Sequence, residues 1–319
     1  MTSSTLTAPP GAPAASPRRR GTRAGGGMRV APYIFLAPFM LSFVVFMILP
    51  IVVALYTSFF QVKRSGLGFG GDNDSMFVGF DNYVQAFANS AFMDSFGRVL
   101  LFGVVQVPIM LALSLLLALL FDSAVVKAKR FFQLAVFLPY AVPSVVAALI
   151  WGFLYQPRVS PIVEGLADLG VSLDFLGPGT VLWSIANVAV WSVTGVNMII
   201  LFSALQTVPR EMYEAARLDG ASEFRMAMQI KLPMIYPALM LTTLFSIIGT
   251  LQLFNVPMTM RSVTSNISGS YTPNMAIFSA TTLGGNINLG SAMAIILGLA
   301  TFVLSIVVSI MTNRKKGKA

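Results

Sequence analysis

Residues 208–233, VPREMYEAARLDGASEFRMAMQIKLP, form the longest charged, helix-favouring stretch in a chain that is otherwise apolar. The stretch carries four acidic and four basic side chains: Glu211, Glu214, Asp219, Glu223, Arg210, Arg217, Arg225 and Lys231. Apolar runs too long for ordinary core helices flank it on both sides. We therefore expect a solvent-exposed insertion between two membrane spans.

Composition places the chain among multi-pass membrane proteins. Of 319 residues, 56% are hydrophobic and 10% are charged, against about a quarter charged in a typical soluble domain. The net charge is +9, but the basic residues are scattered between apolar runs, so nucleic-acid binding is not expected. Neither cysteine nor histidine occurs, which excludes disulfides, Cys/His metal sites and Ser-His hydrolase chemistry. We expect no catalytic residue, cofactor or metal in this chain.

Six apolar runs reach the length of about 20 residues that a membrane helix needs. They predict an all-α integral membrane protein with six transmembrane helices within residues 28–313, at about 31–56, 99–121, 131–154, 181–205, 234–253 and 289–311. Prolines in or near these runs should bend them, which packed membrane helices tolerate. Residues 1–27 predict a disordered basic tail rather than a signal peptide, since the apolar run that follows is too long.

The basic residues predict the orientation of the chain. With the N-terminus in the cytosol, sixteen of the twenty-one lysines and arginines fall on the cytosolic side, as the positive-inside rule requires. Both termini, the stretch 208–233 and a short basic tail at 314–319 are then cytosolic. The outer segments at about 57–98, 155–180 and 254–288 are either a docking surface for a ligand-delivering protein or plain solvated connectors.

Local signals within 208–233 predict a helix, a sharp turn and a second helix. Thr207 is placed to cap the first helix, near Pro209. Gly220 suits the left-handed conformation that ends a helix, and Ser222 is placed to cap the second. The residue before Pro233 is expected to leave the helical region. A mere connector is the alternative interpretation.

The spacing of Glu214-Ala215-Ala216, three residues, Gly220, nine residues and Ile230-Lys231-Leu232-Pro233 resembles the EAA loop of permease subunits of binding-protein-dependent ABC importers. Asp219 to Ser222 resembles the carbohydrate branch of that family, the maltose and glycerol-phosphate type. FVGFDNY at 77–83, FLP at 137–139 with Trp151, and Gly290-Ser291-Ala292 fit the same branch, so the resemblance extends over about residues 30–312. Residues 254–274 depart from the family pattern, which leaves the substrate open.

The resemblance implies a type I ABC importer permease whose loop contains a coupling helix that docks on a cytosolic ATPase. The coupling residues carried over are Glu214, Ala215, Ala216, Asp219, Gly220, Ile230, Leu232 and Pro233. The implied partners are a second homologous permease in a heterodimer, two ATP-binding cassette subunits that hold ATP and Mg²⁺, an extracytoplasmic binding protein and a carbohydrate. The implied location is the plasma (inner) membrane of a bacterium or archaeon.

The residues themselves also point to an energy source outside this chain. No GxxxxGK[ST] phosphate loop occurs, so ATP binding by this chain is not expected. An ion-coupled secondary transporter or channel is the main alternative, but it would carry ionisable groups within its spans, and none lies mid-span. A membrane-embedded enzyme is a weaker alternative, because His, Cys and paired carboxylates within a span are missing.

Polar and aromatic side chains within the spans suggest a path for a hydrophilic solute, which needs hydrogen-bonding groups inside the bundle. The alternative is that they only join helices. The predicted path residues are Gln106, Asn187, Trp191, Thr194, Asn197, Ser246, Thr250 and Gln252. A path without an evident basic group favours a neutral sugar, with a di- or oligosaccharide preferred.

Overall fold

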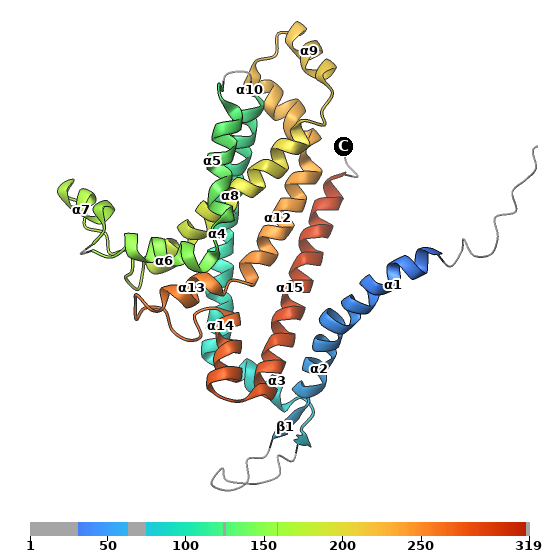
Figure 1. Ribbon diagram of the computed structural model, residues 1–319, viewed down its shortest axis with the longest axis vertical. Helices are drawn as coiled ribbons and strands as arrows, with labels where there is room; N and C mark the ends of the chain where they lie inside the picture. The colour runs from blue at the N-terminus through green and yellow to red at the C-terminus, as the bar shows by residue number, and fades with distance from the viewer. Residues whose placement is uncertain (1–30, 63–74, 124–125, 158, 317–319) are drawn as a thin grey trace, which may run out of the picture. The chain divides into compact units, whose positions relative to one another are not determined.

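The computed structural model describes residues 31–62, 75–123, 126–157 and 159–316 (Figure 1). The predicted tail at 1–27 lies outside these residues. The chain divides into two units, 1–51 and 52–319. The described part of the first unit comprises α1 (Ala31–Phe43), the π-helical segment η2 (Val44–Ile48) and the start of α2 (Leu49–Ser58).

The second unit is built from long apolar helices. They are α4 (Ser90–Asp122), α8 (Val181–Leu205), α12 (Tyr236–Leu251), α15 (Ile287–Lys316) and the bent pair α5 (Lys129–Ala141) and α6 (Ser144–Leu154). In the part of the chain that the structure describes, five helices are long and apolar enough to cross a membrane, or six when the bent pair counts as one span. The predicted helical, multi-span membrane class is confirmed, and the predicted number of six spans is reached when the bent pair counts as one.

The observed helices differ from the predicted spans in length and shape. Helix α4 starts at Ser90, nine residues before the predicted start, because Asn89 accepts a hydrogen bond from the Phe92 amide at 3.0 Å and caps it. The predicted third span is bent by 97°. Val142, before Pro143, has extended backbone angles, as a residue before proline prefers. Helix α15 continues to Lys316, so the predicted tail at 314–319 begins as helix.

The segment 254–288, which was predicted to lie outside, is not a set of solvated connectors. It forms α13 (Asn255–Met260), α14 (Pro273–Phe278) and the π-helical segment η4 (Ser279–Leu283). Met260, Ile267 and Met275 from this segment are at most 2% exposed and join the core formed with α6 and α8. Burial of such side chains stabilises the fold by about 2 kcal/mol each, so this segment is part of the bundle.

The segment 57–98 contains a small sheet that the all-α prediction did not include. Strands β1 (Phe60–Val62) and β2 (Ser75–Phe77) pair antiparallel, with Phe60 opposite Phe77, and α3 (Asp81–Ala88) follows. The side chain of the fully buried Asn82 donates to the carbonyls of Ser58 and Phe60, each at 2.8 Å. The element FVGFDNY therefore clamps the end of α2 to α3, since carbonyls past a helix end need such donors. A further short helix, α7 (Pro161–Asp168), lies between α6 and α8 in the sequence.

Helices α5 and α8 approach each other closely at Gly195. A Cβ atom added there would lie 2.2 Å from the Val136 carbonyl oxygen and 2.8 Å from the Phe137 Cα. Because both neighbours are backbone atoms, the contact cannot relax by turning a side chain. Small residues allow such close packing between membrane helices, where dispersion replaces the hydrophobic effect as the driving force.

We expect Gly195→Ala to destabilise the protein by about 1–3 kcal/mol, the usual cost of overpacking. Gly249→Ala on α12 is the matched control, because a Cβ there meets nothing within 4 Å. Thermal unfolding of both variants in detergent should show a lower Tm for the first alone. Equal melting temperatures for Gly195→Ala and wild type would mean that α5 and α8 do not pack as described.

Candidate functional site

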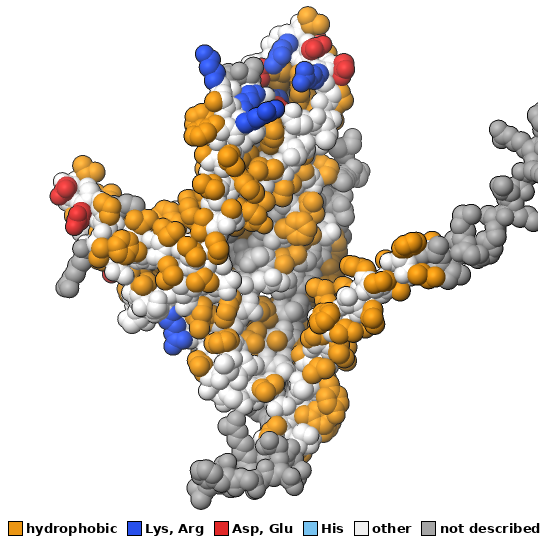
Figure 2. Space-filling view, viewed as in Figure 1, with side chains coloured by type: hydrophobic (Ala, Val, Ile, Leu, Met, Phe, Trp, Pro, Cys, Tyr) orange, Lys and Arg blue, Asp and Glu red, His pale blue; other side chains and the backbone are white. Residues whose placement is uncertain are grey.

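The charged loop projects from one end of the second unit. Helix α9 (Arg210–Leu218) and helix α10 (Glu223–Met226) lie at the same end as the C-terminal end of α15, opposite to α3 and α14 (Figure 1). Figure 2 shows Lys, Arg, Asp and Glu side chains gathered at this end, while apolar side chains cover the middle of the bundle. This distribution fits a bundle inside a membrane with its charged loop in water.

Two of the four predicted turn signals in this loop, Gly220 and Ser222, are confirmed. Gly220 has φ +76° after α9, and the Ser222 hydroxyl accepts a hydrogen bond from the Arg225 amide at 3.3 Å. The predicted cap by Thr207 is wrong: its hydroxyl donates to the Ala204 carbonyl at 2.8 Å, and Pro209 holds the N-cap position. Because Pro209 precedes the first residue of α9, Thr207 does not occupy the position whose side chain caps that helix.

The chain does not leave the helical region before Pro233, so that prediction is also wrong. The π-helical segment η3 (Ala227–Lys231) runs directly into α11 (Leu232–Met234), and Leu232 has helical angles. Pro233 lies in the first turn of α11, where the missing amide costs little. The break comes at Ile235, with φ −90° and ψ 4°, just before α12.

The predicted coupling residues occupy three environments. Glu214, Ala215, Asp219, Gly220 and Pro233 are exposed, Ile230 and Leu232 are half-buried, and Ala216 is only 9% exposed. Ala216 therefore packs within this chain and does not offer its surface to a partner. Two large apolar side chains at the tip, Leu218 and Phe224, are 89% and 74% exposed. These two side chains are therefore accessible to a partner at this end of the chain.

A buried ion pair lies at the base of the loop. Lys231 Nζ is 2.6 Å from Asp122 Oδ2, and the two side chains are 8% and 10% exposed. Gln206 Nε2 donates to the other oxygen of Asp122 at 3.0 Å. The Lys231 ammonium also lies 5.2 Å from the centre of the Tyr213 ring. Residues from the ends of α4 and α8, from α9 and from η3 thus meet at one point.

Tyr213 joins this cluster mainly through its ring. The ring packs against the buried residues of α4 and α8, while its buried hydroxyl has no hydrogen-bond partner among the described residues. Burial, and then the charge of Asp122, raise the pKa of the Tyr213 phenol above its usual value. The phenol therefore stays neutral, so the cluster holds one cation, Lys231, against one anion, Asp122.

Four predicted path residues line one cavity of about 400 Å³ between α4, α8 and α12. They are Gln106, Asn197, Ser246 and Thr250, and the further polar residues Tyr140, Ser144 and Ser192 line the same cavity. The Thr250 hydroxyl donates to Gln106 Oε1 at 3.4 Å. No charged side chain from the described residues lines this space, so it can hydrogen-bond a hydroxylated solute without a charged group.

The other four predicted path residues lie elsewhere. Asn187 donates to the Tyr155 hydroxyl at 2.8 Å and lines a separate cavity of about 480 Å³ together with Trp151 and Trp183. The Trp191 ring meets the Trp151 ring edge to face at 5.8 Å.

The remaining two path residues are Thr194 and Gln252. The buried Thr194 hydroxyl donates to the Val190 carbonyl at 2.6 Å, so it caps its own helix turn. Gln252 lines a third cavity of about 860 Å³ with residues of α14 and α15. Six of the eight predicted path residues are thus divided among three spaces, whereas Trp191 and Thr194 are not among the residues that line them.

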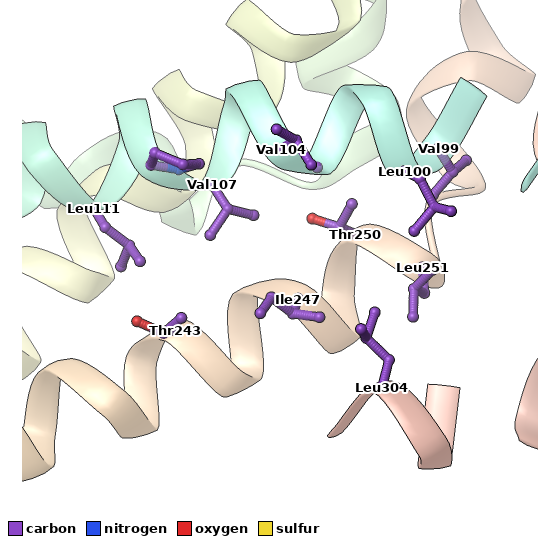
Figure 3. Close-up of a pocket in the computed structure, with 12 residues that line it drawn as sticks. Val99, Leu100, Val104, Val107, Leu111, Thr243, Ile247, Thr250, Leu251 and Leu304 are labelled. Atoms are coloured by element: carbon purple, nitrogen blue, oxygen red, sulfur yellow. The ribbon is translucent and has the colours of Figure 1, made fainter. Parts of the chain in front are cut away.

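A fourth space, of about 530 Å³, is lined almost wholly by hydrocarbon groups. It lies between α4, α12 and α15, and its labelled residues are Val99, Leu100, Val104, Val107, Leu111, Thr243, Ile247, Thr250, Leu251 and Leu304 (Figure 3). A hydrophilic solute would lose its water hydrogen bonds there without replacement. Of these two spaces, the polar cavity beside Ser246 is the candidate path.

Membrane-spanning helices around an uncharged polar cavity, with a helical loop projecting at one end, define a membrane permease component. Residues 110–314 match the family described as "Binding-protein-dependent transport system inner membrane component". The chain belongs to this family, which confirms the resemblance carried by the Glu214 to Pro233 spacing. This membership decides against an ion-coupled secondary transporter or channel.

Relatives named "sn-glycerol-3-phosphate transport system permease protein UgpA" are similar in sequence. The protein from Shigella flexneri is 35% identical over 210 residues, which cover 66% of this chain and 69% of the relative. The protein from Pectobacterium atrosepticum is 35% identical over 207 residues, 65% of this chain and 68% of the relative.

Solved structures show the same fold. A crystal structure of a bacterial ABC transporter involved in the import of the acidic polysaccharide alginate contains a chain with TM-score 0.76 and 20% identity, covering 90% of this chain and 96% of that chain. The same values hold for the bacterial alginate ABC transporter in complex with alginate pentasaccharide-bound periplasmic protein. The fold is therefore that of an ABC importer permease.

Sequence reasoning missed the residues that hold the loop to the bundle. Lys231 counted as one cytosolic base among four, and Asp122 lies at the end of an apolar run without a motif around it. The two residues are 109 positions apart in the sequence, so no local spacing predicts that they pair. The available signal was that Asp122 follows the end of one predicted span and Lys231 precedes the start of another, with both residues predicted on the same side of the membrane.

Because the chain has no cysteine, single cysteines can test which space holds water. We expect Ser246→Cys in the cavity between α4, α8 and α12 to react with a charged thiol reagent at least about tenfold faster than Ile247→Cys in the fourth space. Only the thiolate reacts, and apolar surroundings suppress its formation. Rates measured in nanodiscs at one pH provide the comparison. Equal rates would show that the cavity beside Ser246 is no more hydrated than its neighbour.

Proposed function

We propose that this chain forms half of the membrane path of an ABC importer that carries a neutral carbohydrate inward, with a di- or oligosaccharide preferred. The other half is a second, homologous permease. Two cytosolic ATPase subunits hold ATP and Mg²⁺ and perform the hydrolysis, so this chain is not itself an enzyme. A binding protein outside delivers the solute, and both termini lie in the cytosol of a bacterium or archaeon.

The observation that carries the substrate proposal is that amide and hydroxyl groups, but no charged side chain of the described residues, lie in the otherwise apolar lining of the cavity. Amide and hydroxyl groups of Gln106, Asn197 and Ser246 can exchange hydrogen bonds with sugar hydroxyls. An anionic solute would need a cation or several amide donors to replace its hydration. The relatives' name refers to sn-glycerol-3-phosphate, but among the described residues the cavity lining of this chain offers no such cation.

The charged loop supports the proposed energy source. Leu218 and Phe224 offer an exposed apolar contact at its tip, and Glu214 adds an exposed carboxylate beside it. Docking of these groups into an ATPase subunit would let ATP-driven closure displace the loop. Displacement then reaches the cavity walls if α4 and α12 move as rigid bodies.

Uptake by the reconstituted importer tests the substrate. We expect proteoliposomes that contain the permease pair, the ATPase and the binding protein to accumulate labelled maltotetraose in an ATP-dependent manner, and sn-glycerol-3-phosphate at least about tenfold more slowly, because an anion meets no cation in the cavity. Faster uptake of sn-glycerol-3-phosphate would overturn the neutral-sugar proposal. Uptake driven by an ion gradient without ATPase would overturn the importer class.

Substitution at Gly220 tests the coupling loop. Gly220→Val should abolish most ATP-dependent uptake, because a β-branched residue is strained at φ +76°. Gly220→Asn is the matched control, since asparagine tolerates the left-handed region, and it should retain uptake. Co-purification with the ATPase should fall for the valine variant alone. Retained uptake and co-purification by Gly220→Val would show that the shape of this turn is not needed for coupling.

A further inference from the structure

The Asp122–Lys231 pair connects the loop to both walls of the polar cavity. Asp122 is the last residue of α4, and Gln106 lines the cavity sixteen residues earlier on the same helix, about 24 Å away at 1.5 Å per residue. Lys231 ends η3, which continues through α11 and the break at Ile235 into α12, where Ser246 and Thr250 line the cavity. One contact therefore fixes the cytosolic ends of two cavity-lining segments against each other.

The burial of this pair is not explained by stability alone. Desolvation of two charges consumes most of their attraction, so a buried pair is often no more stabilising than two apolar side chains of similar size. What the pair supplies is geometry, because Asp122 Oδ2 accepts from Lys231 at 2.6 Å while Oδ1 accepts from Gln206 at 3.0 Å. By contrast, the Arg217–Glu223 pair within the loop leaves its side chains 57% and 58% exposed.

Tyr213 adds the link to the docking helix. Its ring lies under the Lys231 ammonium and packs on the apolar cluster around Leu201, Leu205 and Ile235. A push on α9 would therefore reach Lys231 through this ring, and Lys231 holds the end of α4. Each step in this series, from Tyr213 to Lys231 and from Lys231 to Asp122, is a contact between described side chains.

We propose that the Asp122–Lys231 pair is the mechanical joint of the permease: it passes displacement of the loop to α4 and α12 and so changes access to the cavity. This inference rests on the proposed ABC importer function. Asp122 and Lys231 are positioning residues, because they touch neither solute nor nucleotide. Loss of the joint should leave ATP hydrolysis running while the cavity no longer responds to it.

The test uses the complete importer with Ser246→Cys as a reporter in this cysteine-free chain. The rate of maleimide labelling of this subunit is compared between the nucleotide-free complex and the complex trapped with ATP and vanadate. Four changes are introduced: Asp122→Asn, Lys231→Met, both together, and the reversal Asp122→Lys with Lys231→Asp. Arg130→Gln is the control, since it removes an exposed cation at the start of α5. Tm, ATPase activity and co-purification with the ATPase are measured in parallel.

The double neutral variant separates a joint from a stabilising contact. It leaves no unpaired buried charge, so its Tm and assembly should return toward wild type. We expect its labelling rates in the two states to differ by less than about twofold, whereas wild type, Arg130→Gln and the reversal differ by at least about fivefold, the lower end of typical coupling between sites. The single variants should resemble the double variant in labelling but have a lower Tm.

If the double neutral variant shows wild-type labelling rates in both states, the pair is not a mechanical joint but a structural contact only. Failure of the reversal to restore the labelling difference, in a complex that assembles normally, would also overturn it. Both results are distinct from failure of the proposed function, because that would appear as absent ATP-dependent uptake by the wild-type importer.

Discussion

The absence of water around the spans is the constraint on which this structure depends, because every polar group within the membrane must find its partner inside the protein. Asn82 supplies donors to two carbonyls past the end of α2, and Thr194 returns its hydroxyl to its own helix. Ser114 donates to the Thr194 carbonyl at 3.0 Å and so joins α4 to α8. Gln106 and Thr250 bond each other, Asn197 donates to the Met110 sulfur, and Ser246 donates to the Thr242 carbonyl. These side chains thus have partners inside the protein and also line the cavity proposed for the solute.

The same constraint explains how the two ends of the bundle differ. At the loop end, one buried cation and one buried anion balance each other where four helical elements meet. At the opposite side, the segment 254–288 folds back as short helices whose apolar side chains fill the space beside α6 and α8. This chain thus has a buried ion pair beside apolar packing at the loop end and, in the segment 254–288, short apolar helices joined to α4 by the contact of Tyr271 with Arg98.

Hydropathy and local turn signals were enough to predict most of the fold. The length of a span, the turn at Gly220 and the cap at Ser222 depend only on residues nearby in the sequence. Features set by distant residues escaped prediction. The helical run through Pro233 depends on a π-helical turn before it, the burial of Ala216 on the cluster beneath α9, and the Lys231 pairing on a residue 109 positions away. For the path, helical periodicity placed Asn187 and Asn197 on one face, but ten residues along α8 bring them to different cavities.

The clustering of the aromatic rings on α6 and α8 has a spectroscopic consequence. All three tryptophans of the sequence are there: Trp151 and Trp191 meet edge to face, and Trp183 lines the same cavity as Trp151. The tryptophan fluorescence of this subunit therefore reports on that one region, and the charged loop contributes no tryptophan to it. An added fluorophore at the loop would have its own, unmixed signal, so the two ends of the permease can be timed separately within a single transport cycle.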